Sequence, residues 1–167
     1  MLKTNKNIER MFHMSHILFT ILNGIPLLCS GVFLGVALAT SLVSVPKMKD
    51  PNLTKEQLVS LWRQDFKSTA PIQIGLVLLA TLCSIALLIF YPTNKFLLSL
   101  GCGILLITLP WTLFVLMPIN NQLLSDTVTD NASLTAVQAL VNKWAFLHIP
   151  RIICAFVAFI FFYCALI

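Results

Sequence analysis

Charged residues are scarce in this sequence. Only 10% of its 167 residues are Asp, Glu, Lys or Arg, whereas 58% are hydrophobic. Soluble domains carry about 25% charged residues, so the composition excludes a soluble domain and predicts an integral membrane protein. A chain of this length has room for about four helical spans of roughly 20 residues each. We expect one four-span transmembrane domain over residues 1–167.

Cysteines are absent from the predicted loops. All five lie inside apolar runs, and no CxxC or Cys/His spacing occurs. This excludes a disulfide-stapled exterior and gives no sign of a zinc site or a redox pair. We interpret the cysteines as small packing residues. They are Cys29, Cys83, Cys102, Cys154 and Cys164.

The span interiors lack the usual ligands of a metal or haem. None contains His, Asp or Glu, so a haem or di-iron centre in the bundle is unsupported. His13 and His16 precede the first span and His148 precedes the fourth, on the opposite side of the membrane. The three histidines therefore cannot share an ion if the first span is placed correctly. We predict no metal and no cofactor.

Basic residues exceed acidic ones, giving a net charge of +5, but they are scattered along the chain. This scatter fits Lys and Arg side chains that reach the membrane interface and contact lipid phosphates better than it fits a nucleic-acid-binding surface. Membrane lipid is the expected partner, and no nucleic acid is expected.

Four charge-poor runs predict an all-α fold, a membrane four-helix bundle. They cover residues 27–45, 68–94, 96–117 and 149–167. The apolar character of the first run extends upstream to Ile17, so this span is long, bent or preceded by an interfacial piece. Pro110 predicts a kink in the third span.

Two short amphipathic helices are expected in the loops after spans one and three, lying along the membrane surface and leading into the next span. Thr54 and Gln57 have capping-box spacing, and Ser133 is placed to cap the second helix. Apolar residues then recur at helical spacing in both loops. They include Leu58, Leu61, Trp62 and Phe66 in the first loop and Leu134, Val137, Val141 and Trp144 in the second.

Membrane orientation stays open. Seven basic residues on the side of the two large loops against four on the other favour cytoplasmic loops, whereas sequons at Asn52 and Asn131 favour a lumen. A cleaved leader ending near Ala37-Leu38-Ala39 is the weaker alternative, because the preceding apolar stretch is too long for a typical signal. We expect a multi-pass protein of an endomembrane in a eukaryote or of the inner membrane in a bacterium.

Polar residues gather where the spans meet the two large loops. Four spans place the ends of spans one and three and the starts of spans two and four on one side, so these residues converge at one mouth of the bundle. They are Lys47, Trp62, Asp65, Gln73, Asn120, Asn121, Trp144, His148 and Arg151. Each alone is explained by interface anchoring or helix capping. Together they favour a small-molecule pocket.

Several motifs resemble the four-span anthrone oxygenase family, first described as a domain of unknown function. The resemblance covers nearly the whole chain. Its residues are Val45-Pro46, Trp62, Pro110-Trp111-Thr112, Met117-Pro118-Ile119-Asn120-Asn121, Trp144, Leu147-His148 and Arg151.

The resemblance implies an oxidoreductase that converts an anthrone-type aromatic ketone to a quinone with dioxygen, without metal or flavin. Such chemistry needs a base, donors that hold an enolate oxygen, and a dry pocket. On this hypothesis His148 is the base, with Asp65 as the alternative, and Arg151 with Asn120 or Asn121 stabilises the enolate. Substrate-binding roles go to the remaining candidates, which are Trp62, Asp65, Trp111, Thr112 and Trp144.

Two other function classes remain compatible with the residues. A non-catalytic membrane module would bind lipid or a partner's spans through the small-residue stripe of Gly31, Gly35 and Ala39. It predicts no enclosed cavity on the loop side. Whether the chain forms a homo-oligomer stays open. A transporter or channel is weaker, because the spans lack an intramembrane charge and a broken-helix pair.

Overall fold

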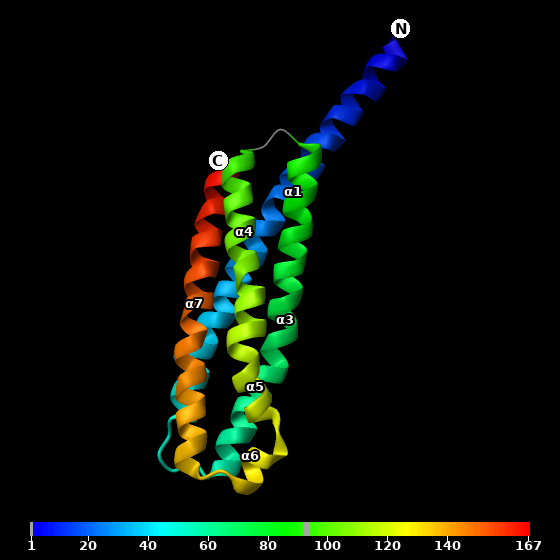
Figure 1. The fold of residues 1–167 in the computed structure, drawn as a ribbon. Helices are drawn as coiled ribbons and strands as arrows, with labels where there is room; N and C mark the ends of the chain where they lie inside the picture. The colour runs from blue at the N-terminus through cyan, green and yellow to red at the C-terminus, as the bar shows by residue number, and fades with distance from the viewer. Residues whose placement is uncertain (1, 92–93) are drawn as a thin grey trace.

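The computed structural model describes residues 2–91 and 94–167, and side chains from residue 17 onward except those of Thr127 and Thr129. His13 and His16 therefore lie outside the described side chains. Seven α-helices and two π-helical turns follow one another along these residues (Figure 1). They are α1 (Leu2–Ala39), η1 (Thr40–Ser44), α2 (Val45–Met48), α3 (Lys55–Phe90), α4 (Lys95–Trp111), η2 (Thr112–Leu116), α5 (Met117–Leu124), α6 (Asp126–Asn131) and α7 (Leu134–Leu166).

Four helical stretches are long and apolar enough to cross a membrane. They are Ile17–Met48, Lys55–Phe90, Lys95–Leu124 and Leu134–Leu166. In the bundle α1 packs against α3 and α7, and α4 packs against α7. No strand occurs in the described part of the chain. The all-α four-helix membrane bundle is confirmed.

The two amphipathic segments are helical, but the structure does not confirm them as separate interfacial helices. The capping box is present, with the Gln57 amide N–H donating to Thr54 Oγ1 at 3.3 Å, and Ser133 caps α7. From these caps α3 and α7 each run on into a membrane span as one helix. Their apolar faces pack against α5 and each other in a buried cluster instead of lying on a lipid surface.

Both π-helical turns lie shortly before a proline. The last N–H before each proline, from Val45 and Met117, donates to the carbonyl five residues earlier, Thr40 and Thr112 respectively. The wider turn accommodates a helix that continues into Pro46 or Pro118. The kink expected at Pro110 stays a prediction; Pro110 lies inside α4, two residues before the η2 turn begins at Thr112.

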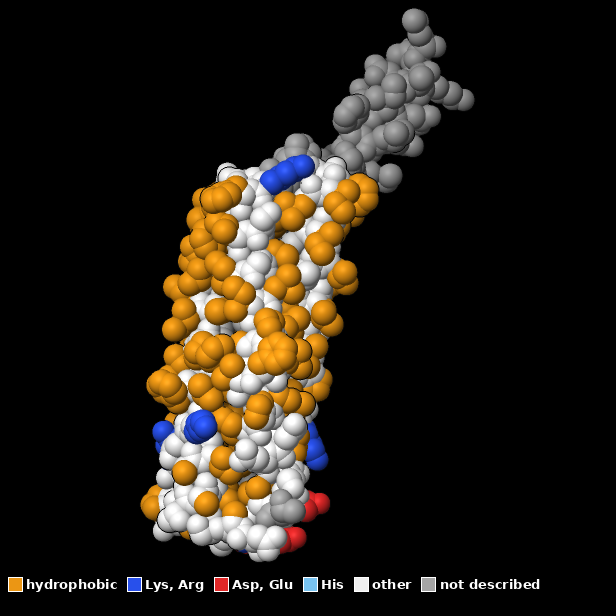
Figure 2. Space-filling view, in the orientation of Figure 1, with side chains coloured by type: hydrophobic (Ala, Val, Ile, Leu, Met, Phe, Trp, Pro, Cys, Tyr) orange, Lys and Arg blue, Asp and Glu red, His pale blue; other side chains and the backbone are white. Residues whose placement is uncertain are grey.

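Buried apolar residues form two clusters along the bundle. The membrane-centre core consists of Cys29, Phe33, Ala37, Val77, Ala80, Leu87, Leu98, Cys102, Leu105, Ala155, Ala158 and Phe162. The loop-side core consists of Val45, Met48, Leu58, Val59, Trp62, Leu116, Ile119, Leu123, Val128, Val137, Val141 and Trp144. All four spans carry exposed apolar side chains, and on the face seen in Figure 2 these form a broad band that suits contact with lipid.

Small residues allow close helix approach inside the bundle. A Cβ added at Gly31 would lie 3.2 Å from the Phe159 ring, and one at Gly101 would lie 3.0 Å from Phe162. Gly31 therefore serves contact between α1 and α7. Gly35 and Ala39, the rest of that stripe, lie on an open surface.

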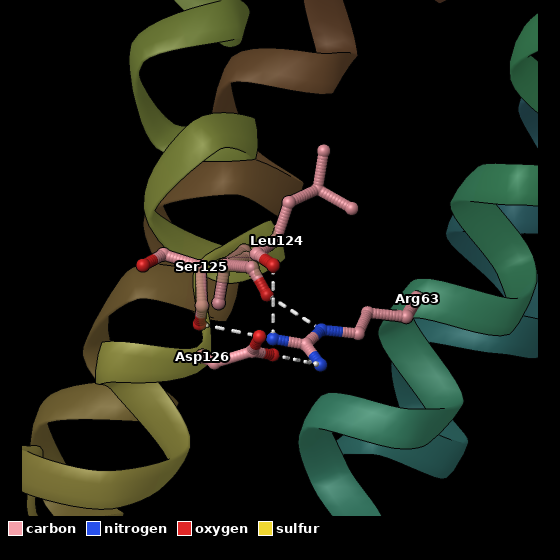
Figure 3. Close-up of polar contacts among 5 residues, drawn as sticks. Arg63, Leu124, Ser125 and Asp126 are labelled. Carbon is pink, nitrogen blue, oxygen red and sulfur yellow. Dashed lines mark hydrogen bonds and ion pairs between the residues drawn. The ribbon is translucent and has the colours of Figure 1, made fainter.

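Arg63 fastens the end of α5 to α3 (Figure 3). Its Nε donates to the Leu123 carbonyl at 3.0 Å, and its Nη2 donates to the carbonyls of Leu124 and Ser125 at 3.0 and 2.9 Å. Its Nη1 also lies 3.4 Å from Asp126 Oδ1. The last carbonyls of a helix have no partner within the helix, so this guanidinium caps α5 and closes the loop-side core.

Replacing Arg63 with Met is expected to destabilise the fold by about 2–3 kcal/mol, because carbonyls that accept from a charged donor lose it. The measurement is the unfolding midpoint in mild detergent, followed by circular dichroism. Asp126→Asn is the control. Its carboxylate is exposed, so this change should cost less than about 1 kcal/mol. Equal losses in the two variants would contradict the capping role.

Candidate functional site

A cavity of about 310 Å³ lies between the two cores. Its walls come from α3, from the end of α4 with η2 and α5, and from α7, and Phe33 of α1 closes its back. Most of the lining is apolar. The polar lining residues are Thr69, Gln73, Thr108, Thr112, Asn120, His148 and Arg151.

Arg151 is the cation of this pocket. Its Nη2 donates to Gln73 Oε1 at 2.7 Å, and its Cζ lies 5.3 Å from the centroid of the Phe33 ring. Its Nε is buried without a hydrogen-bond partner. Among the described residues the ion pairs are Lys55–Glu56 and Arg63–Asp126, and Arg151 has no carboxylate partner. A cation in an apolar site without a counter-ion favours an anionic ligand.

His148 offers two unpaired ring nitrogens. The residue is 2% exposed, and neither Nδ1 nor Nε2 makes a hydrogen bond within the described part of the chain. The backbone of Ala37 lies near the ring, but without the geometry of a hydrogen bond. The Trp144 ring lies beside it, with centroids 5.4 Å apart. An imidazole placed this way is available to take or give a proton inside the pocket.

Two amides complete the polar wall. Gln73 and Asn120 are each 2% exposed, and Gln73 Nε2 and Asn120 Oδ1 lack partners. Asn120 Nδ2 lies 4.0 Å from Met117 Sδ in its own helix. Each unsatisfied buried polar atom costs about 1–3 kcal/mol. Several of them around one cavity therefore indicate a site made to hold a ligand or ordered water.

The tryptophans form a layer beside the pocket. Trp62 stacks on Phe66, with centroids 5.1 Å apart, and meets the edge of Trp144 at 5.7 Å. Phe66 and Trp144 line the cavity, whereas Trp62 lies behind them and is fully buried. Trp62 thus supports two aromatic walls and does not form one itself.

Nine residues were given catalytic or substrate-binding roles from the sequence, and the structure brings five of them together around the cavity. These are Thr112, Asn120, Trp144, His148 and Arg151. The others lie elsewhere. Asn121 is exposed, and Trp111 donates its indole N–H to the Leu147 carbonyl at 3.0 Å, tying α4 to α7. Trp62 lies behind the aromatic walls.

Asp65 points to the η1 turn and not to the pocket. Its carboxylate accepts hydrogen bonds from Ser44 and, at 3.5 Å, from Thr40 Oγ1. Both donors belong to the η1 turn. Asp65 lines a separate, shallow hollow together with Lys47. Its place makes it a link between α3 and η1.

Several lining residues received no role from the sequence. Gln73 belonged to the polar set expected at the mouth, and as the one amide within residues 69–90 it carried a usable signal. Phe33, Thr69 and Thr108 lie on apolar helices in patterns no different from lipid-facing or packing positions. No sequence signal distinguishes them.

Metal ligands are not clustered in the described side chains. Within that part of the chain, no group of three or more His, Cys, Asp or Glu residues is placed to hold a metal ion. All five cysteines are free thiols.

Comparison with known proteins identifies the family to which the chain belongs. No curated protein and no solved structure matches the chain. The family model described as anthrone oxygenase matches residues 62–161, which contain every lining residue of the cavity except Phe33. This match covers more than half of the sequence, and the chain therefore belongs to the anthrone oxygenase family.

Proposed function

We propose that the cavity binds a small, planar aromatic ketone of the anthrone type and oxidises it to a quinone with dioxygen. One observation carries the proposal: unpaired polar atoms of Gln73, Asn120, His148 and Arg151 converge on one apolar cavity. Its volume of about 310 Å³ is at the small end for ligand pockets. This size suits a compact ring system better than a long chain.

Charge supports an enolate in the pocket. An anthrone-type ketone that loses a proton from the CH₂ of its carbonyl-bearing ring carries negative charge on oxygen. Arg151 is the cation that would hold this oxygen, and the Asn120 amide is a second donor. Gln73, through its 2.7 Å bond, aims the guanidinium. In an apolar setting this attraction is stronger than in water.

His148 would take the proton from the ring carbon opposite the carbonyl. The resulting electron-rich enolate reacts with dioxygen to form a carbon–oxygen bond, and the peroxide loses water as the second carbonyl forms. Overall, the substrate's CH₂ gives up both hydrogens to one molecule of water and gains one oxygen atom. The proton held by His148 returns to the departing oxygen. Phe66 and Trp144 would flank the rings.

The non-catalytic module is less favoured. It predicts that the polar residues only cap helices and anchor the interface, whereas several face a cavity without partners. Gly31, part of its proposed docking stripe, is used for packing within the chain against Phe159. Lipid contact through the exposed apolar band is compatible with either function.

Purified protein mixed with anthrone is expected to consume one dioxygen for each anthraquinone formed, followed with an oxygen electrode and by quinone absorbance. Ala70→Phe fills the pocket from α3 and should lower the rate by about 10-fold or more, since loss of productive binding is felt directly in kcat/KM. Ala39→Phe, on an open surface, should leave it unchanged. If both variants kept the full rate, oxidation would be occurring outside this cavity.

A further inference from the structure

We infer that the pocket receives its ligand sideways from the lipid bilayer, between α3 and the α4–η2–α5 segment, and not from the aqueous loop end. This rests on the proposed use of the cavity as a substrate site. It adds the ligand's source: an apolar molecule dissolved in the bilayer.

Both ends of the cavity are covered. Toward the loops lies the loop-side core, in which Trp62 and Leu123 are 0% exposed. Arg63 holds α5 closed over that core through three carbonyls. Toward the other end lies the membrane-centre core, which contributes Phe33 to the pocket wall. Close-packed apolar side chains leave no path for a water-borne ligand at either end.

The side of the cavity, in contrast, carries exposed lining residues. Ile74 of α3, Leu113 of η2 and Met117 of α5 line the cavity and are 47%, 60% and 36% exposed. A residue that both lines a cavity and lies on the outer surface marks its rim. These three form a rim between α3 and the η2–α5 segment, which we call the portal.

The portal lies at the level of the hydrocarbon. Lys67 is the last charged residue of α3, and Ile74 follows it by seven residues, about 10 Å further along the helix. Residues 96–125, on the other edge, contain no charge. The surface around this level is the broad apolar band in Figure 2. Lipid chains, and molecules dissolved among them, therefore contact the portal directly.

The test measures access to Trp144, which lines the pocket but is only 4% exposed. The full chain with Trp62→Phe and Trp111→Phe retains this single tryptophan. It is placed in phosphatidylcholine bilayers with bromine at the middle of the acyl chains, a contact quencher confined to the lipid. Acrylamide is the quencher that arrives from water. Quenching by bromine and little by acrylamide is expected.

Filling the portal should remove that quenching. Ile74→Phe with Leu113→Phe narrows the rim, and the bromine quenching of Trp144 should be lost. Leu82→Phe with Ile107→Phe is the matched control on the same helical hairpin, at exposed positions outside the pocket, and should retain it. Quenching by acrylamide without quenching by bromine, or equal bromine quenching in the two double variants, would overturn the lateral route.

Two features keep the test decisive. If the single-tryptophan chain fails to fold, the same two double variants are compared in the chain with all three tryptophans, where the portal variant alone should lose part of its bromine quenching. The readout is fluorescence and not turnover. A negative result therefore removes the lateral route and leaves the oxidation to be decided by oxygen uptake.

Discussion

His148→Ala is expected to lower the rate of anthrone oxidation by about 10²- to 10⁴-fold, the range that a positioned general base contributes. The physical reason is that no other unpaired base faces the cavity among the described side chains: Asp65 is engaged by Ser44 and Thr40. The fall should appear in kcat, with a much smaller change in the dissociation constant of the product quinone. Initial rates of oxygen uptake over a range of anthrone concentrations provide the measurement.

Two further measurements distinguish a base at position 148 from a residue that only supports the fold. If the residue is the base, added imidazole should partly restore the rate of His148→Ala, because the truncation leaves room beside Trp144. Substrate deuterated at its CH₂ should also react more slowly in the wild-type chain. His148→Ala that folds and oxidises anthrone at the wild-type rate would rule out this assignment.

Arg151→Met is expected to cost about 10²- to 10³-fold in kcat, comparable to the loss of a donor that stabilises an oxyanion. The guanidinium is the pocket's one positive charge in the described residues and has no carboxylate partner there. The kcat of Arg151→Lys should lie between those of Arg151→Met and the wild type. An ammonium keeps the positive charge but lacks the planar guanidinium that can contact Gln73 and the substrate oxygen at the same time. Gln73→Leu should lower kcat less than Arg151→Met, since it acts through the guanidinium.

The unfolding midpoint distinguishes a functional role of Arg151 from a structural one. Arg151 is half-buried, and it has no carboxylate partner among the described residues. Replacing a buried charged group together with its partner by apolar side chains of similar volume is often neutral or stabilising by about 1–4 kcal/mol. Arg151→Met alone strands the Gln73 carbonyl oxygen, so the double variant with Gln73→Leu gives the cleaner comparison. Its unfolding midpoint should be no lower than that of the wild type. A large drop in midpoint with activity retained would instead make Arg151 a structural residue.

The helices and their starts were predictable because their signals are local. Long charge-poor runs predict spans whatever packs against them, and Thr54 and Ser133 cap through amides only a few residues away. The separate interfacial helices were predicted from the same periodicity and were not confirmed. Periodicity reports that a face is apolar, and it does not report whether lipid or a neighbouring helix covers it.

The approximate location of the site was predictable from the sequence, but which residues line it was not. Counting spans predicted that Asn120, His148 and Arg151 converge on the loop side of the bundle, and all three line the cavity, which lies deeper, between the loop-side core and the membrane-centre core. The bond between Arg151 and Gln73 joins residues 78 apart, and neither local pattern requires the other. Likewise Trp62 and Asp65 lie within a helical turn of Phe66, which lines the cavity, but their own side chains do not line it.

The sequence by itself determined the class of protein, the four spans, the helix caps and the motifs of the family, because composition, hydropathy and capping act over a few residues. Only the tertiary structure decided which polar side chains face inward. Asn120 and Asn121 show the reason. Neighbours on a helix point about 100° apart, and packing of α5 against α3 and α7 buries the first at 2% exposure while leaving the second outside.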